Sequence, residues 1–386
     1  MLELFIEKKE KSKRIALVED SKLVEFYEEN ENENRNEGNI YIGIVKNILN
    51  GMESAFVDIG TGKNSLIHLT DLLPKLDIKK EQKHKNVAID KTIKPGDKIL
   101  VQVKKDSNEI KGARTSTHIN LPSRYIVLMP NTDIITISQK IENKEEQERL
   151  INLVKENLSE ENGAIIRTSA EGKSQEIIDD IKRIEEKWNL IKKESKEYNK
   201  NNPQLIYKAE DITNKILLDF EEKTINSIYT NNEEECKKIR EYGNYNIIFK
   251  NKGIFEKYDI EKQINNIKNR KIWLNCGGFI TIDKTEALTA IDVNTGKFTG
   301  KDNLMQTILK VNKEATIEIA RQLRLRDIGG IIIIDYIDMK SEESKKEIQD
   351  LLITNLKKDR SKTQVEGFTK LDLMEMTRKH ICSHKN

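Results

Sequence analysis

The sequence has few cysteines and no long apolar run. Its 386 residues contain three cysteines, Cys236, Cys276 and Cys382, which lie far apart and form no CxxC pair. This spacing excludes a disulfide framework, and we expect a reducing, cytoplasmic environment. No apolar run approaches the ~18 residues that a membrane span requires. The apolar patch at the N-terminus contains Glu3 and Glu7, so we expect no signal peptide.

Neither sign of charge is in excess. Lysine and arginine total 67 against 65 for aspartate and glutamate, so 34% of the chain is charged while the net charge is only +2. This balance excludes a polycation that holds nucleic acid through its overall charge, and any such binding would need basic residues placed locally. Hydrophobic residues make up a modest 36%, but their regular patterning favours a folded chain of two to three domains over disorder.

Proline is also scarce, and all five prolines fall in the first 203 residues. We therefore expect loops and short strands in front and longer uninterrupted elements behind. From Gly38 to about Thr117, short alternating strands separated by glycine turns predict a small β-barrel. Residues 145–158 predict an amphipathic helix, and residues 174–198 predict a long helix with an apolar stripe. We expect that stripe to pack against the protein's own core, although a coiled-coil seam has the same spacing.

The C-terminal part predicts a strand–helix–strand unit that follows a hairpin over residues 272–282. Residues 287–293 form a buried strand, a helix is expected from Asp302 onward, and residues 331–334 form a second buried strand that ends in Asp335. Such a unit favours parallel neighbouring strands joined by a right-handed crossover.

Polar residues stand where these two strands end. If the strands are neighbours, Asp292 and Asp335 lie together at the edge where open parallel sheets bind ligands. Two carboxylates there suit Mg²⁺ with retained waters. Asn294, two residues after Asp292, faces the same side and could hold a phosphate oxygen or a metal-bound water. We expect Asp338 to support this site from outside or to cap the next helix. The alternative is that the strand-end aspartates only cap helices.

Basic residues lie near these carboxylates, and Lys297 is the best candidate for a phosphate contact. Two other motifs fail. Gly172-Lys173-Ser174 resembles the end of a phosphate-binding loop, but Arg167 stands where the first glycine of that motif would be. The His380-x-Cys382-x-His384 motif could offer metal ligands, but it lies at the chain end without a second cluster. We expect a frayed tail there rather than a zinc site.

Several long strings of sequence resemble one known family. ALTAIDVNTGKFTG (287–300), IARQLRLRDIGGIIIIDYIDM (319–339) and MEMTRKH (374–380) closely resemble the ribonuclease E/G family, nearer to its ribonuclease G branch. NIYIGIVKNILNGMESAFVDIG (39–60) resembles the S1-type OB-fold RNA-binding domain of that family. INLPSRYIVLMPN (119–131) and IIRTSAEGKS (165–174) resemble its sensor of RNA 5′ ends. The resemblance covers essentially the whole chain.

The resemblance implies a multidomain fold of the α+β and α/β classes. It divides the chain into an RNase-H-like subdomain split between residues 1–37 and 212–275, an inserted S1-type OB-fold β-barrel over 38–117, a 5′-end sensor over 118–211, and a DNase-I-like catalytic α/β subdomain over 276–386.

The resemblance also implies roles for individual residues. Asp292 and Asp335 match the Mg²⁺ ligands of the family, and Asn294 matches the residue that supports the reacting phosphate. The matches to RNA-contacting residues are Phe56 and Lys111 on the OB domain, with Arg167, Thr168 and Arg378 in the pocket for a 5′-monophosphate.

Three departures from the family pattern affect these expectations. Phe56 and Tyr41 are the main aromatics available for base stacking on the OB domain, so we expect weaker stacking there than in relatives. Gln139 stands where relatives can have a basic residue, which would weaken the sensor. The chain ends at Asn386 without the CPxC zinc link of relatives, so we expect no zinc-linked tetramer and leave a homodimer open.

These expectations combine into one predicted function and one alternative. The prediction is a Mg²⁺-dependent endoribonuclease that cleaves single-stranded RNA in RNA processing and decay, acting in rRNA maturation, mRNA turnover or both, and favouring 5′-monophosphorylated substrates. The alternative is a non-catalytic RNA-binding or ribosome-associated protein that uses the OB domain.

Overall fold

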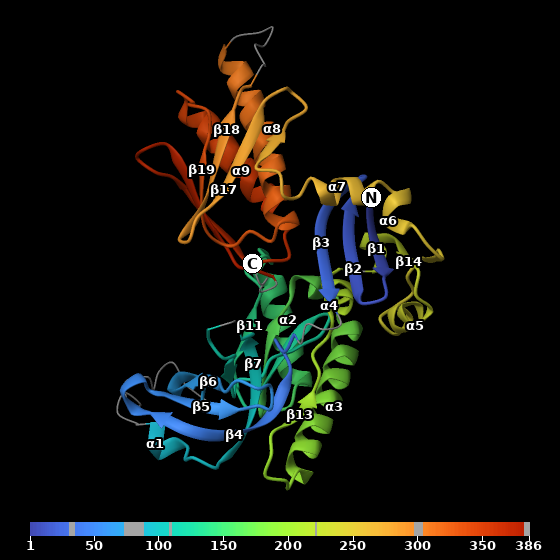
Figure 1. Cartoon of the computed structure of the whole chain (residues 1–386), viewed down its shortest axis with the longest axis vertical. Coiled ribbons are helices and arrows are strands. Elements are labelled where there is room, and N and C mark those ends of the chain that lie inside the picture. Colours follow the sequence, from blue (N-terminus) through green and yellow to red (C-terminus); the bar gives the residue numbers. More distant parts are fainter. Residues whose placement is uncertain (31–34, 73–88, 108–109, 221, 297–303, 382–386) are drawn as a thin grey trace. The chain divides into compact units, whose positions relative to one another are not determined.

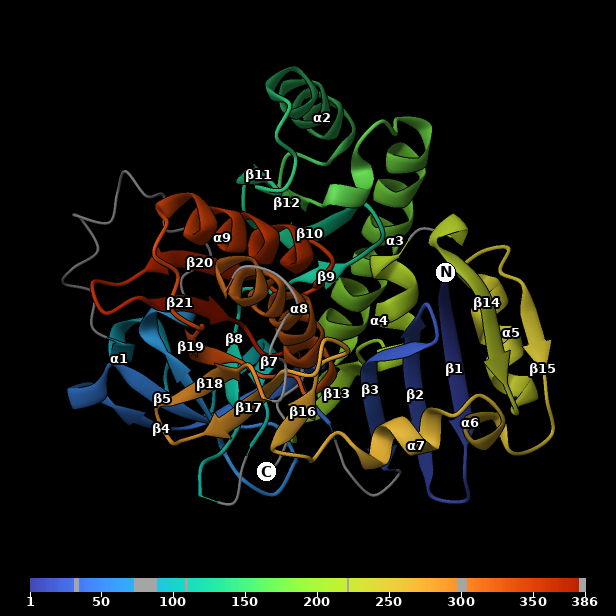
Figure 2. The same cartoon turned by 90° about the horizontal axis from the view of Figure 1, so that it is seen from above.

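The chain is a mixed α/β protein with several modules (Figures 1 and 2). The computed structural model describes all residues except 31–34, 73–88, 108–109, 221, 297–303 and 382–386. The chain divides into two compact units, one from residues 33–221 and one from residues 1–32 together with 222–384. In the described part of the chain, no helix has the length and apolar character needed to cross a membrane.

The unit of residues 33–221 contains a closed five-stranded barrel. The barrel closes because β4 pairs with both β5 and β7, while β6 and β8 complete the ring and β13 extends the sheet beside β4. The elements are β4 (Ile40–Leu49), β5 (Ser54–Asp58), β6 (Ser65–His68), α1 (Ile89–Thr92), β7 (Lys98–Lys105), β8 (Arg114–Ser116) and β13 (Gln204–Tyr207). Closure removes the exposed strand edges of a small sheet. The sequence prediction of a small β-barrel is confirmed, and its form is consistent with an OB fold.

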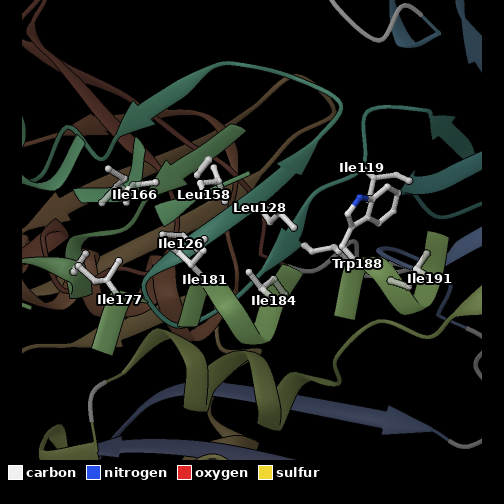
Figure 3. Packing of buried hydrophobic residues seen from close by; sticks show 14 of the residues in the cluster. Ile119, Ile126, Leu128, Leu158, Ile166, Ile177, Ile181, Ile184, Trp188 and Ile191 are labelled. Carbon is white, nitrogen blue, oxygen red and sulfur yellow. The ribbon is translucent and has the colours of Figure 1, made fainter. Parts of the chain in front are cut away.

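A four-stranded sheet and two helices form the rest of this unit. The strands follow the order β11-β12-β10-β9. The elements are β9 (Leu121–Pro122), β10 (Ile126–Pro130), β11 (Ile135–Ile137), α2 (Lys144–Asn157), β12 (Asn162–Ile166), α3 (Gln175–Glu197) and α4 (Ile212–Asp219). The apolar stripe of α3, from Ile177 to Ile191, is buried against strand residues such as Ile126 and Leu128 (Figure 3). The stripe therefore packs against the protein's own core, as expected.

The other unit contains two sheets. The first is five-stranded with the order β15-β14-β1-β2-β3. Its elements are β1 (Leu2–Lys8), β2 (Ser12–Glu19), β3 (Lys22–Asn30), β14 (Ile225–Thr230), α5 (Glu233–Glu241), β15 (Ile247–Phe249), α6 (Ile254–Lys257) and α7 (Ile260–Asn265). Because β1 pairs in parallel with β14, the N-terminal segment and a segment from the middle of the chain build one sheet.

The second sheet of this unit is six-stranded with the order β16-β17-β18-β19-β21-β20. Its elements are β16 (Lys271–Trp273), β17 (Phe279–Lys284), β18 (Leu288–Asn294), α8 (Leu304–Leu325), β19 (Gly330–Asp335), α9 (Glu342–Leu356), β20 (Thr363–Phe368) and β21 (Leu373–Arg378). Strands β16 and β17 form the predicted antiparallel hairpin, and β18 and β19 are the predicted parallel neighbours joined through α8. Asp302, expected to cap α8, lies outside the described residues.

Helices α8 and α9 cover only one face of this sheet (Figure 1). Their residues Val311, Ile319 and Leu352 share one core with strand residues such as Ile291 and Ile334. The strand residues between these point away from the helices, and the side chain of Ile331 is 51% exposed. The prediction of fully buried strands is therefore wrong for β18 and β19. A continuous apolar run is typical of strands covered on both faces, but here only alternate residues are buried, and we call the other side the open face.

Candidate active site and RNA-contact residues

Asp292 and Asp335 lie side by side at the carboxyl ends of β18 and β19. The two strands pair in parallel with Asp292 opposite Asp335, and opposite residues of neighbouring strands project from the same face. Both side chains are exposed, whereas Ile291, Val293 and Ile334 beside them are buried in the core. The two carboxylates therefore share the open face, as the strand–helix–strand pattern predicted.

Asn294 lies next to this pair. Its Nδ2 donates a hydrogen bond to Oδ2 of Asp292, so the amide and the carboxylate face the same side. Helix α9 is capped by Ser341, whose Oγ accepts a hydrogen bond from the backbone N–H of Ser344 at 3.3 Å. The idea that Asp335 or Asp338 caps this helix is therefore wrong. The aspartates at the end of β19 are free of that structural task.

The electrostatics of the site favour a bound cation. The pKa of the Asp335 carboxyl is raised above its ordinary value, first by partial burial and then by the negative charges of Asp292 and Asp338. Among the residues that the structure describes, no lysine or arginine forms an ion pair with Asp292 or Asp335. The like charges of these carboxylates repel each other, and an added cation would relieve that repulsion.

The donor set fits a hard divalent cation. Within the described ranges, no group of three or more histidine, cysteine, aspartate or glutamate side chains is arranged to hold a metal ion. This leaves two carboxylates with an amide beside them. Mg²⁺ is usually held by one or two carboxylates and keeps several waters, whereas zinc sites use three or four protein ligands of which most are nitrogen or sulfur. Asp292 and Asp335 therefore suit a hard divalent cation that keeps waters in its coordination shell.

The residues predicted to contact RNA on the barrel lie on its outer side. Phe56 is half-buried on β5 and pairs with Leu66 of β6, which in turn pairs with the exposed Arg114 of β8. Lys111 is exposed and precedes Gly112, where an added Cβ would come within 1.9 Å of the Asn64 carbonyl oxygen. This close approach, which only glycine permits, fixes the segment that carries Lys111 beside the start of β6.

Tyr41 is not available for base stacking on the barrel. It is 6% exposed, belongs to the barrel core, and its hydroxyl donates a hydrogen bond to Oδ1 of Asn36 at 2.8 Å. The sequence interpretation of Tyr41 as a stacking residue is wrong, because its side chain alternates with Ile40 and Ile42 and faces the barrel interior. Phe56 is then the aromatic of the predicted pair that the barrel presents outward.

Arg167 and Thr168 follow β12 and stand at the start of a short 3-10 turn. Arg167 is partly exposed and donates hydrogen bonds to the Ser123 carbonyl oxygen, at 2.8 Å, and to the carboxylate of Asp219. Thr168 is exposed, and its hydroxyl lies 3.0 Å from that of Ser138. Asp219 therefore holds one side of the guanidinium that was predicted to read a phosphate.

Arg378 belongs to the other unit and is fully enclosed. Its guanidinium donates to Asp359 Oδ2 at 2.7 Å and to Asp327 Oδ1 at 2.8 Å, and its side chain has no exposed surface. Burial alone would lower the pKa of Arg378, but the hydrogen bonds and charges of Asp359 and Asp327 outweigh burial and raise it. It borders a surface depression of about 340 Å³ shared with Lys362 and Lys379. A role in reading a 5′-phosphate stays a prediction for Arg378.

The remaining predicted positions add less. Lys297 lies outside the described residues, as do Cys382 and His384 of the suggested zinc motif. His380 has a ring nitrogen, Nδ1, 2.8 Å from the backbone oxygen of Asp327. Gln139 is exposed in the turn after β11, next to the exposed Lys140.

Comparison with known proteins identifies the family. The model of the ribonuclease E/G family matches residues 120–381, which include Arg167, Asp292, Asn294 and Asp335. The chain belongs to the ribonuclease E/G family. Among similar proteins, Ribonuclease G of Salmonella typhimurium (strain SL1344) is 38% identical over 388 residues, covering 95% of this chain and 77% of the relative.

Two further relatives give the same assignment. Ribonuclease G of Escherichia coli (strain K12) is 39% identical over 382 residues, which cover 95% of this chain and 77% of that protein. Ribonuclease E of Nostoc sp. (strain PCC 7120) is 36% identical over 356 residues, covering 89% of this chain and 51% of that protein. The resemblance stated from sequence motifs to the ribonuclease E/G family is confirmed.

Sequence reasoning missed part of the surface around the carboxylates in this member of the ribonuclease E/G family. Lys271, Trp273 and Phe279 lie on β16 and β17, on the same open face as Asn294. The available signal was the sequence Lys271-Ile272-Trp273. Ile272 packs against the core, so Lys271 and Trp273 on either side of it both point to the other face. The strand was recognised, but the direction of its side chains was not used.

Proposed function

We propose that this member of the ribonuclease E/G family is an endoribonuclease of RNA processing and decay that cleaves single-stranded RNA at Asp292, Asn294 and Asp335. The observation that carries the proposal is the in-register pair Asp292 and Asp335, which is exposed and forms no ion pair with a lysine or arginine among the described residues. Acids kept unpaired at the ends of neighbouring strands suit a divalent metal ion that handles phosphate. We assign Mg²⁺ as that ion.

The residues of the chain would divide the work as follows. Asp292 and Asp335 would hold the ion from two neighbouring strands, whose hydrogen-bonded register fixes the spacing of their carboxylates. Asn294 is held beside Asp292 and would orient a phosphate oxygen through its side-chain amide. When bound, the ion would supply Lewis-acid stabilisation of the phosphodiester and an activated water. Asp338 would add negative charge near Asp335 without acting as a ligand.

The modules support this assignment. We assign the closed barrel, over about residues 38–117, as an S1-type OB domain that contacts RNA through Phe56 and Lys111, with Lys297 as a further contact near the carboxylates. The sheet β15-β14-β1-β2-β3 suits the RNase-H-like part split between residues 1–37 and 212–275. Residues 118–211 would form the 5′-end sensor, and 276–386 the DNase-I-like catalytic part. The two cysteines in the described part of the chain, Cys236 and Cys276, are free thiols, which favours a cytoplasmic location.

A preference for 5′-monophosphorylated RNA would depend on Arg167 and Thr168. A guanidinium beside a hydroxyl suits a terminal phosphate. Because Asp219 already binds the Arg167 guanidinium, a phosphate would have to share or displace that contact. Because Gln139 stands nearby where a basic side chain would strengthen phosphate binding, we expect the preference for a 5′-monophosphate to be modest. The guanidinium of Arg378 is already bound by Asp327 and Asp359, so we expect no direct contact between it and a 5′-phosphate.

One assay tests this function. We expect the chain to cut an A/U-rich oligonucleotide only when Mg²⁺ is present, with the 5′-monophosphate form cut faster than the 5′-hydroxyl form. The isosteric change Asp335→Asn should lower the cleavage rate at least ~100-fold, because charge stabilisation at the phosphate is lost. RNA binding should remain within a few-fold. Retained Mg²⁺-dependent cleavage in this variant would overturn the site assignment.

The second candidate is a non-catalytic RNA-binding or ribosome-associated protein that uses the barrel. The outward position of Phe56 and the exposure of Lys111 and Arg114 are compatible with that function. The same assay separates the two, since a binding protein would retain RNA without cutting it at any Mg²⁺ concentration. The unpaired carboxylates favour the enzyme, because a binding protein gains nothing from repulsion between Asp292 and Asp335.

A further inference from the structure

An aromatic and basic cluster lies on the open face of the sheet that carries Asp292 and Asp335. Lys271 and Trp273 lie on the edge strand β16, and Phe279 begins β17. Ile272, between the first two, packs against the core, so Lys271 and Trp273 point to the opposite side. The Trp273 side chain is 58% exposed. We call Lys271, Trp273 and Phe279 the edge cluster.

The three side chains of the edge cluster contact one another. The rings of Trp273 and Phe279 meet edge to face, with 5.3 Å between their centroids. The Lys271 Nζ lies 4.1 Å from the centroid of Trp273 and 3.5 Å from that of Phe279. The ammonium thereby lies over the faces of both rings, which leaves the other face of Trp273 for a base. Aromatic faces that accept stacked bases, next to a cation that tracks the phosphate backbone, are the two components of single-strand binding surfaces.

The register of the strands brings the edge cluster next to the proposed active site. Trp273 pairs with Phe279, and Phe279 pairs with Asn294. Since neighbouring strands lie ~4.8 Å apart, Trp273 is about 10 Å from Asn294 across the sheet. A Cβ added to Gly296 would lie 3.3 Å from Phe279 Cδ1 and 3.4 Å from Trp273 Cζ3. Both rings therefore lie close to the turn that follows Asn294, within reach of a neighbouring nucleotide.

A purely structural role does not explain the exposure of Trp273. Trp188, the other tryptophan of the chain, is 3% exposed and packs in a core as a stabilising aromatic does. Trp273 leaves most of its ring in water at the edge of a sheet. The charge next to Trp273 also suits RNA. Lys271 adds a positive charge beside a site whose own side chains are acidic. A phosphodiester chain bound at Asn294 would meet that charge next.

We propose that the edge cluster is a nucleobase-stacking subsite for the RNA substrate, in which a base next to the scissile phosphate stacks on Trp273 while Lys271 contacts an adjacent phosphate. The proposal rests on the ribonuclease function proposed above. Every base has a π face, so such a subsite accepts all four bases. It requires that the base be unpaired, because a base within a helix is already stacked on its neighbours. The subsite would therefore select single-stranded RNA without reading its sequence.

The test measures RNA binding by the full chain in EDTA, so that no cleavage occurs. The probes are a single-stranded oligonucleotide and a series in which one nucleotide at a time is abasic. We expect Trp273→Ala to raise the Kd of the intact RNA about ten-fold, in the range of one lost stacking contact. Trp273→Tyr should restore most of the affinity. At one position of the series, the abasic RNA should bind to the unchanged chain as weakly as intact RNA binds to Trp273→Ala. The same abasic RNA should bind to Trp273→Ala no more weakly than that.

Tryptophan fluorescence gives a second readout. Bound RNA should quench Trp273 and protect it from acrylamide, and the remaining signal of Trp188 in the Trp273→Ala variant should not respond to RNA. Phe249→Ala is the matched control, because Phe249 is an exposed strand aromatic of another sheet, with 42% of its surface exposed. It should leave the Kd unchanged.

Two results would overturn the proposal. One is that Trp273→Ala weakens intact and abasic RNA equally at every position, or weakens neither. The other is that the variant has a smaller mass in sedimentation with unchanged RNA binding, which would assign the edge cluster to contact between copies of the chain. Failure of the ribonuclease function is seen separately, as absent Mg²⁺-dependent cleavage by the unchanged chain, and leaves these binding measurements valid.

Discussion

The buried carboxylate of Glu25 is paired with arginines, whereas the exposed carboxylates of Asp292 and Asp335, in the same unit, are paired with none that the structure describes. Glu25 on β3 is fully buried and is held by Arg360 at 2.7 Å, Arg324 at 3.3 Å and the Tyr27 hydroxyl at 2.9 Å. Asp292 and Asp335 stand on an open face and have no such partner among the described residues. The chain thus supplies its own cations where an acid must be buried.

The pKa values express the same difference. Burial by itself raises the pKa of the Glu25 carboxyl, but the charges of Arg360 and Arg324 outweigh burial and bring the pKa down to about 2. The pKa of Asp335 is raised, by partial burial and by the charges of Asp292 and Asp338. A lowered pKa marks an acid that stabilises the fold, and a raised one marks an acid held in place against repulsion, as at functional sites.

The largest expected effect is on stability and comes from breaking the ion pairs of Glu25. Glu25→Gln should lower the free energy of unfolding by ~3 kcal/mol, because two buried arginines lose their counter-charge. The folded pKa of about 2 lies below the ordinary value of 4.5. The stabilisation is therefore complete above pH ~4.5 and is lost as the pH falls toward 2.

Urea unfolding of the unchanged chain and of Glu25→Gln at several pH values would check this. The difference between the two should shrink as the pH falls below ~4.5. Glu366→Gln, at an exposed strand position, is the control and should change stability by less than ~0.5 kcal/mol. A constant difference across the whole pH range would contradict the assigned ion pairs.

The second effect is on metal affinity and comes from placing a lysine next to Asp292. Thr281 lies opposite Asp292 on β17, so Thr281→Lys would bring an ammonium within reach of that carboxylate. We expect Mg²⁺ affinity to fall about ten-fold, because the lysine neutralises Asp292 and repels the ion. Calorimetric titration with Mg²⁺ measures the change.

A charge-matched control separates this effect from added charge alone. Ala287→Lys places the same charge in the exposed turn before β18, about 16 Å from Asp292 along the strand. It should leave Mg²⁺ affinity within about two-fold, since charges this far apart at the surface are largely screened. Equal losses in both variants would argue against a metal site at Asp292.

The smallest effect concerns the pH dependence of cleavage, which should follow the pKa of Asp335. Asp338→Asn removes one of the negative charges that raise the pKa of Asp335, so that pKa should fall toward its ordinary value. Protons compete with the metal below this pKa, so the acidic limb of the cleavage profile should move to lower pH. A pH–rate profile measures the limb, and Asp372→Asn, at an exposed acid paired with Lys345, should leave it in place. A limb that moves to higher pH would contradict the described repulsion.

The sequence predicted much of the site because its signals are local. Strand ends marked by Asp292 and Asp335, with a helix between them, were enough to predict a parallel pair, since crossover connections follow few rules. Arg378 shows where local reasoning stopped. It alternates with Met374 and Met376 on β21 and therefore faces the covered side. That alternation was available in the sequence, but the partners Asp327 and Asp359 come from distant segments.

The sequence by itself determined the family, the closed barrel and the presence of two acids at the ends of successive strands. Hydrophobic periodicity and motif order depend on neighbours along the chain. Only the tertiary structure decided that α8 and α9 leave one face of the sheet open and that Asp292 faces Asp335 in register. It also decided that Trp273 and Lys271 share that face with Asn294. Register and coverage depend on pairing between segments far apart in the chain, which periodicity does not encode.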